Sequence, residues 1–329
     1  MQRQRNALAA CIAAALLAVP TAALAQGGVR DYGSRPIRVV VPVAAGGGTD
    51  VIARLIATGL GESAGFQMIV DNRGGAGGVI GSETVARAIP DGYTLLFPYA
   101  SHTTMPFIAK VPYDAYSDFA PVTQVAVQPL VLIVHPSLPV NNVKDLIAFA
   151  KSTPKGLNAG IATPGSAGHL ATELFKLRTG TTGGIVSVVY KGTAATQVAL
   201  LSGEVQILFV STPSAMPYLK TGKVKMLATS SNKRIAYLPE LPTFAELGVP
   251  VEASPWQGIL GPAKMPRAIV MRLYGEVAKL IRQPNMIERL AAAGSEPVGS
   301  TPEEFGAKIK QELQEFGKLI PTLGLKGAP

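Results

Sequence analysis

Cysteine is almost absent from this chain of 329 residues, in which Cys11 is the only one. It lies within an N-terminal segment that we expect to be removed, so the mature protein would carry no thiol. Although Leu8-Ala9-Ala10-Cys11 resembles a lipoprotein cleavage box, a cut there would leave almost no apolar run ahead of it. The shortage of cysteine therefore excludes disulfides, thiolate metal sites and thiol nucleophiles in the mature protein.

Histidine is scarce as well. His102, His135 and His169 are far apart in sequence and lack the H-x-x-x-H spacing, so we predict no metal site. The glycine-rich run Gly74–Gly81 fails as a dinucleotide fingerprint, because Ile80 stands where the third glycine belongs. No Gly-Lys-Ser or Gly-Lys-Thr occurs, which excludes a phosphate-binding loop. The sequence therefore predicts no cofactor.

Long apolar runs are missing after the first residues. Arg3 and Arg5 precede an apolar run over 7–19, and Ala23-Leu24-Ala25 then offers small residues to a signal peptidase. The run is shorter than the about 20 apolar residues that span a bilayer. We therefore predict a signal peptide over 1–25, cleavage before Gln26 and export to the periplasm.

Charge is sparse and slightly positive. Charged residues make up 16% of the chain, the formal net charge is +9, and removal of Arg3 and Arg5 leaves +7. Because Lys and Arg are scattered and form no run with interleaved aromatics, we predict no nucleic-acid partner. A mild positive field would instead concentrate small anions around the protein. The length, with 47% hydrophobic residues, allows two globular lobes.

Short β-branched runs alternate with amphipathic segments, a pattern that predicts parallel sheets flanked by helices. We expect an α/β protein of two lobes, each a mostly parallel sheet flanked by helices, with a ligand cleft between them. Residues 26–126 and 229–329 would form a discontinuous first lobe, and 127–228 the second. The expected strands are 37–43, 67–71, 94–98, 131–135, 157–162, 185–190, 205–210 and 225–228.

The last part of the chain is expected to be mostly helical. Thr301 is predicted to cap a final helix, with Pro302 in its first turn and Glu304 completing a capping box. We interpret this helix as a structural element and place no site on it. Its buried face is expected to consist of Phe305, Ile309, Leu313 and Phe316.

Three predicted strands run into loops of small residues that open helices, at Ala44–Asp50, Thr163–His169 and Lys191–Ala195. Small residues let backbone N–H groups approach a ligand, and the helix start carries a partial positive charge, so each loop suits an anion. Any one loop alone is more simply an ordinary strand-to-helix turn, but three in two lobes favour a shared site. The candidate ligand contacts, which include a polar loop at 101–104, are Ala45, Gly47, Gly48, Thr49, Asp50, Ser101, His102, Thr163, Gly165, Ser166, His169, Lys191, Gly192, Thr193 and Ala194.

An exported serine esterase with Ser166 as nucleophile is the sharpest alternative. Its nucleophile elbow would read G-x-S-x-G, but Pro164 occupies the first glycine position. Ser166 is better explained as the N-cap of the following helix. For His102 and His169, an ordinary surface position is the alternative to a place in the cleft. We therefore expect no enzyme activity.

Eight short segments, weak alone, form a specific pattern together. They are Pro36–Pro42, Gly47–Asp50 with Ala53-Arg54, Asp71–Arg73 with Gly75–Gly78, Pro90–Leu96, Tyr190–Gly192, Leu241–Thr243 with Glu246 and Gly248, Trp256–Gly258, and Thr301–Phe305. In these segments, which cover nearly all of the mature protein, the chain resembles the substrate-binding receptors of tripartite tricarboxylate transporters, the Bug family.

The resemblance implies a two-lobed periplasmic binding protein of the second type, which delivers a small carboxylate to the membrane permease subunits of such a transporter. It implies that Gly47–Asp50 grips the carboxylate, partly through water, opposite Thr163–His169 and Lys191–Ala194. Because Asp50 is itself acidic, we expect it to cap its own helix or to order water rather than to touch the anion.

The chain departs from the family pattern at two positions. Gln206 stands where family members commonly carry Asp, and an acid is missing near Ser211. We expect both positions beside the cleft, where they would alter which polar group of the ligand is accepted. The expected ligand is an organic acid, an amino acid or an aromatic carboxylate, bound by a monomer. A ligand-sensing subunit of a signalling system, with the same fold and cleft, is a further alternative.

Overall fold

The computed structural model describes residues 32–46, 48–153, 156–162, 164–190, 192–231, 233–235, 238–249, 251 and 255–322. The expected signal peptide, its cleavage site and Cys11 lie outside these ranges, as do three expected ligand contacts, Gly47, Thr163 and Lys191. Within the ranges described, no helix combines the length and the apolar character that a membrane crossing needs.

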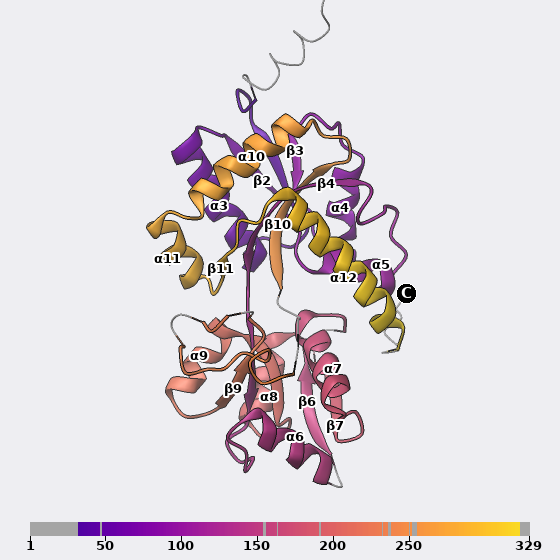
Figure 1. The fold of residues 1–329 in the computed structure, drawn as a ribbon, viewed down its shortest axis with the longest axis vertical. Helices are drawn as coiled ribbons and strands as arrows, with labels where there is room; N and C mark the ends of the chain where they lie inside the picture. Colours follow the sequence, from indigo (N-terminus) through magenta and orange to yellow (C-terminus); the bar gives the residue numbers. More distant parts are fainter. Residues whose placement is uncertain are drawn as a thin grey trace, which may run out of the picture. The chain divides into compact units, whose positions relative to one another are not determined.

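The first sheet, called sheet A, has six strands in the order β11-β4-β10-β3-β1-β2 (Figure 1). Its strands are β1 (Ile37–Val41), β2 (Met68–Asn72), β3 (Thr94–Leu96), β4 (Phe119–Val127), β10 (Trp256–Pro262) and β11 (Glu296–Pro297). The accompanying helices are η1 (Ala76–Gly78), α3 (Gly48–Ala64), α4 (Val79–Ala86), α5 (Ser101–Ile108), α10 (Arg267–Leu280), α11 (Pro284–Ala292) and α12 (Pro302–Thr322). The β-branched run of β1 is buried at four of its five positions, as an inner strand covered on both faces requires.

The second sheet, called sheet B, has five strands in the order β7-β6-β8-β5-β9. Its strands are β5 (Leu130–Val134), β6 (Leu157–Ile161), β7 (Ile185–Val189), β8 (Ile207–Ser211) and β9 (Lys225–Thr229). Its helices are α6 (Val143–Ser152), α7 (Ala167–Thr179), α8 (Thr193–Leu201) and α9 (Thr212–Lys220). Every side chain of β5 is buried, since this strand lies between β8 and β9 within the sheet.

The expected fold of two sheets flanked by helices is confirmed, but both sheets are mixed and not mostly parallel. In sheet A, β1 pairs in parallel with β2 and β3, whereas β10 runs antiparallel to β3 and β4. In sheet B, β6 pairs in parallel with β7 and β8, whereas β5 runs antiparallel to β8 and β9. The reason is the chain path: β4 leads out of sheet A towards β5, and β10 returns from sheet B, so these neighbouring strands point in opposite directions.

The return of the chain to sheet A comes later than the boundary expected at residue 229. Thr229 still forms a bridge with Thr243, and Phe244 and Val251 pack into the core of sheet B. The next strand of sheet A begins only at Trp256. A segment that was expected in the first lobe therefore covers the second sheet.

The final helix has the predicted capping box. The Glu304 carboxylate accepts the Thr301 N–H at 2.8 Å, and the Thr301 hydroxyl accepts the Glu304 N–H at 3.2 Å. Phe305, Ile309 and Phe316 are buried along the apolar face of α12, and Leu313 is partly buried. The capping box and the apolar face of this helix are therefore confirmed.

Candidate functional site

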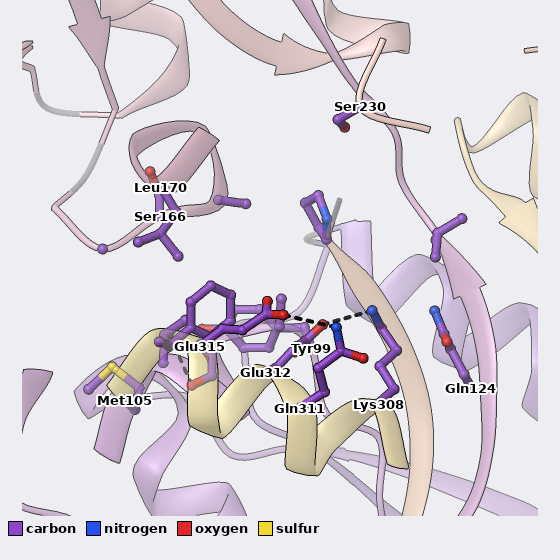
Figure 2. A pocket seen from close by; sticks show the side chains of 18 of the residues that line it. Tyr99, Met105, Gln124, Ser166, Leu170, Ser230, Lys308, Gln311, Glu312 and Glu315 are labelled. Atoms are coloured by element: carbon purple, nitrogen blue, oxygen red, sulfur yellow. Dashed lines mark hydrogen bonds and ion pairs between the residues drawn. The ribbon is translucent and has the colours of Figure 1, made fainter. Parts of the chain in front are cut away.

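A cavity of about 810 Å³ is lined by elements that belong to both sheets (Figure 2). From sheet A, the cavity is lined by one face of α5, residues of β4 and β11 and one face of α12. The start of α7 and residues that follow β9 line it from sheet B. Small-molecule sites typically measure about 300 to 1,000 Å³, so this cavity is the candidate functional site.

The start of α7 brings a capped helix N-terminus to the cavity. The hydroxyl of Ser166 accepts a hydrogen bond from the backbone N–H of His169 at 3.3 Å, which confirms Ser166 as the N-cap. The neighbouring Gly165 has a φ of +75°, a conformation that glycine adopts at little cost. Its N–H donates to Nδ1 of His169 at 3.0 Å. Ser166 and Gly165 both line the cavity.

Replacement of Ser166 by alanine is expected to lower the free energy of unfolding by about 1 kcal/mol, because the His169 N–H loses its acceptor. Urea unfolding would measure the change, and Ser166→Asn, which keeps an acceptor, should retain most of the stability. If the wild-type protein hydrolysed simple esters and Ser166→Ala did not, the esterase alternative would replace our interpretation.

The ring of His169 takes part in a buried polar network beneath α7. Its Nε2 lies 3.9 Å from Oε1 of Glu173, which accepts hydrogen bonds from Lys176 at 2.9 Å and from the Ser187 hydroxyl at 2.5 Å. Burial holds the pKa of His169 below its usual value, although the Glu173 carboxylate acts in the opposite direction. With Nδ1 accepting from Gly165, the ring is engaged away from the Ser166 hydroxyl.

The first loop is fixed by the buried carboxylate of Asp50 in the first turn of α3. Its Oδ2 accepts hydrogen bonds from the Gly46 N–H at 2.8 Å and from Nε of Arg54 at 3.0 Å. Its Oδ1 accepts a hydrogen bond from Nδ2 of Asn72 at 2.9 Å. Burial works against ionisation, but the hydrogen bonds from Arg54, Gly46 and Asn72 outweigh it and lower the pKa of Asp50. The Asp50 carboxylate therefore ties the loop at Gly46 to the first turn of α3.

Some of the predicted ligand contacts line the cavity and others do not. Ser101, Gly165 and Ser166 line the cavity. Gly48 lies beside the connection between β4 and β5, where a Cβ atom on it would be 3.3 Å from Nε2 of Gln128. The predicted contacts that are not among the described lining residues of this cavity are Ala45, Gly48, Thr49, Asp50, His102, His169, Gly192, Thr193 and Ala194.

His102 is turned into the interior instead of towards the cavity. It is 3% exposed, its Nε2 lies 2.8 Å from the carbonyl oxygen of Ala115, and its ring stacks on Tyr113 and meets Phe119 edge to face. Burial lowers the pKa of His102 to about 4, against the effect of the hydrogen bond to Ala115. The expectation that His102 lines the cleft fails because the helical turn of α5 that exposes Ser101 directs the next side chain inward.

One face of α12 lines the cavity, although we expected no site on this helix. Figure 2 shows Lys308, Gln311, Glu312 and Glu315 on one side of the cavity and Ser166 and Leu170 on the other. Their spacing of three, four and seven residues is the available sequence signal, because such residues share a helical face. The apolar face predicts the helix, whereas the polar face carries no motif that marks a site.

Glu312 connects α12 to β10 and α5. Its Oε2 accepts hydrogen bonds from Nε1 of Trp256 at 2.8 Å and from the hydroxyl of Thr103 at 2.8 Å. Its Oε1 lies 2.8 Å from Nζ of Lys308. The Glu312 side chain is 13% exposed. This carboxylate therefore satisfies three donors at once at the edge of the cavity.

A second acid faces the cavity from β11. Glu296 accepts a hydrogen bond from the Ser231 hydroxyl at 3.2 Å. Burial raises the pKa of Glu296, and the hydrogen bond from Ser231 opposes that effect. Three acids, Glu296, Glu312 and Glu315, and one base, Lys308, line the α12 and β11 side of the cavity. The start of α7 is the side that favours an anion.

The position of Gln206 corrects the expectation that it lies beside the cleft. Gln206 precedes β8, where its Oε1 accepts the Asn158 N–H at 2.9 Å and its Nε2 donates to the Gly203 carbonyl at 2.8 Å. The α7 loop follows the opposite, carboxyl end of β6, which runs parallel to β8. Ser211 lies at that carboxyl end, where its hydroxyl is 2.9 Å from the hydroxyl of Ser214. Gln206 is thus a backbone-binding residue at the far end of sheet B.

The described part of the chain contains no group of three or more His, Cys, Asp or Glu side chains that could hold a metal ion.

Comparisons with known proteins point to one family. A model of the tripartite tricarboxylate transporter family receptor, TctC, matches residues 52–325. The protein BugT of Bordetella pertussis is 35% identical over 319 residues, which cover 96% of this chain and 95% of BugT.

Two solved structures with bound ligands are similar over most of the chain. Rpa4515 of R. palustris with adipate is 36% identical, with a TM-score of 0.74 and coverage of 91% of this chain and 100% of that one. MatC of Rhodopseudomonas palustris with bound malate is 27% identical, with a TM-score of 0.69 and coverage of 88% and 100%.

Proposed function

Because the chain belongs to the tripartite tricarboxylate transporter receptor family, we propose that it captures a small carboxylate in the cavity between its two sheets and delivers it to a membrane permease. The chain is a periplasmic solute-binding receptor, and receptors of this family work with membrane permeases. The observation that carries the proposal is the cavity of about 810 Å³ lined from both sheets in a chain that the family model matches over 52–325.

The electrostatics of the cavity support one orientation of the ligand. The start of α7 presents backbone N–H groups and the positive end of a helix dipole near Ser166, which suits a carboxylate. On the opposite side, Glu315 would repel a second ionised carboxylate that approached it directly, whereas Lys308 balances the charge of Glu312. The proposed orientation therefore places a ligand carboxylate at α7 and a hydrogen-bond donor or a neutral part at α12.

A carboxylate panel that includes adipate and malate tests this function with the mature protein. A ligand that binds only the folded state stabilises it by about 2.7 kcal/mol at a hundredfold excess over its dissociation constant. We therefore expect at least one carboxylate to raise the thermal unfolding temperature. The matched control is the uncharged diamide of each acid, which should leave the unfolding temperature unchanged. A panel without any shift, or equal shifts by acids and diamides, would contradict the proposal.

The finer features of export and assembly also belong to the proposal. We expect the exported protein to begin at Gln26 after cleavage of the signal peptide, and to be a monomer that uses no cofactor. Intact-mass measurement of protein from the periplasm checks the first residue, and light scattering checks the oligomeric state. An unprocessed mass, or a stable dimer, would overturn the corresponding part.

A further inference from the structure

Two loops, one after a strand of sheet A and one after a strand of sheet B, are held in place by the same arrangement of hydrogen-bonding side chains. In the first, the Gly46 N–H donates to Asp50, four residues later, and Asp50 bonds to Arg54, four residues further on. In the second, the Gly165 N–H donates to His169, four residues later, and His169 faces Glu173, four residues further on. Each loop is therefore tied by its glycine amide to the first turn of the helix that it opens.

The two glycines share a conformation that makes such a tie useful. Gly46 has a φ of +84° and Gly165 a φ of +75°, both in the left-handed region that glycine populates freely. A glycine loop without this hydrogen bond would sample many conformations, and ordering it costs conformational entropy. The hydrogen bond to a buried acceptor selects one of these conformations before any ligand arrives.

The acceptor side chains have little capacity left for a ligand. Asp50 is 2% exposed and receives three donors, and Arg54 balances its charge, so it need not repel an anion near the loop. His169 is 6% exposed, and its Nδ1 is occupied by Gly165 while its Nε2 is directed at Glu173. A direct contact from either residue would require breaking the bond that holds its own loop.

We propose that His169 is a positioning residue, which fixes the backbone at Gly165, a residue that lines the cavity, in the ligand-free protein instead of contacting the ligand. Asp50 holds Gly46 in the same way, at a loop that is not among the described lining residues. Because Nδ1 accepts the Gly165 N–H, the ring proton of neutral His169 is on Nε2, towards Glu173. The geometry of the two loops does not depend on the proposed function, whereas the effect on affinity rests on it.

The experiment uses ¹⁵N-labelled mature protein and compares His169→Leu with His169→Asn. Leucine removes the acceptor, whereas the side-chain oxygen of asparagine occupies about the position of Nδ1. In the wild type we expect NMR to find the ring proton on Nε2 and slow solvent exchange of the Gly165 amide. His169→Leu should speed that exchange about tenfold, the equivalent of one hydrogen bond, and His169→Asn should restore it.

Affinity for adipate or malate, whichever stabilises the wild type, gives the second measurement. We expect His169→Leu to weaken binding about fivefold to tenfold and His169→Asn to recover it. The matched control is Asp145→Leu. It removes the same kind of hydrogen bond, donated by the Asn141 N–H to a side chain four residues later. This bond lies at the start of α6 and not at the cavity. It should leave the affinity unchanged.

Each outcome decides the inference. Fast Gly165 exchange with unchanged affinity in His169→Leu would show that the tie is structural only. Protected exchange with lost affinity in His169→Asn would show that the ring contacts the ligand directly. A ring proton on Nδ1 would overturn the geometry itself. If no carboxylate binds the wild type, the proposed function fails, and the exchange and ring measurements still decide whether His169 holds the loop.

Discussion

The free energy of unfolding of the wild-type protein is expected to fall as pH is lowered from 6.5 to 4. Replacement of His102 by leucine should remove most of this pH dependence. His102 is buried, and its pKa falls from 6.5 to about 4 on folding. Between these values the unfolded chain binds a proton that the folded protein does not, so the free energy of unfolding rises with pH. The neutral, buried His102 therefore contributes about 3 kcal/mol to the free energy of unfolding above pH 6.5. This contribution is fully lost only below pH 4.

The measurement is the free energy of unfolding by urea at several values between pH 4 and pH 7. His102→Leu should be about 1 to 2 kcal/mol less stable at pH 7, because the Ala115 carbonyl loses its donor, but its stability should depend less on pH. A slope remains from His169 and, near pH 4, from Asp50 and Asp71, whose pKa values are also lowered, while the raised pKa of Glu296 acts in the opposite direction. An unchanged slope in His102→Leu would contradict the prediction.

Replacement of Glu312 by alanine is expected to lower the free energy of unfolding by about 3 kcal/mol. The substitution leaves Trp256 Nε1, the Thr103 hydroxyl and Lys308 without their shared acceptor. Trp256 and Thr103 are fully buried. The loss falls mainly on the Trp256 N–H, because the Thr103 hydroxyl can still donate to the Ala100 carbonyl at 3.0 Å. Chemical denaturation at pH 7 measures the effect.

Two variants separate the effect of the Glu312 hydrogen-bond network on stability from the effect of helix propensity in α12. Glu312→Gln keeps an oxygen for Trp256 and Thr103 and loses the ion pair with Lys308, so about 1 kcal/mol is expected. Glu315→Ala removes an exposed acid one turn along the same helix and should change stability by less than about 0.5 kcal/mol. Equal losses in Glu312→Ala and Glu315→Ala would indicate that helix propensity, not the network, sets the effect.

Trp256 makes the same network visible during ligand binding. It is the only tryptophan of the chain, and its Nε1 donates to a carboxylate that lines the cavity. A carboxylate that enters the cavity should therefore alter the tryptophan fluorescence, and Glu312→Gln should reduce the change. The signal reports on binding without a label.

The strands that sequence reasoning found and those that it missed differ in composition. The runs of β1, β5 and β7 are rich in Val and Ile, and the structure has strands there within one or two residues of the predicted bounds. The long strands β4 and β10 were missed, because Thr123 and Gln124 interrupt the first and Gly258 and Gly261 the second. Their pairing with each other across much of sheet A supplies the stability that their local sequence does not.

Local sequence determined what depends on neighbours along the chain: the capping box at Thr301 and Glu304, the N-cap at Ser166, the alternation of strands and helices and the family to which the chain belongs. Tertiary structure alone decided which polar groups face the cavity. Thr103 and Glu312 meet across 209 residues of sequence, and His102 turns inward because Tyr113 and Phe119 surround it. The physical reason is that helical periodicity assigns a side chain to a face of its helix, whereas the neighbour of that face comes from distant segments.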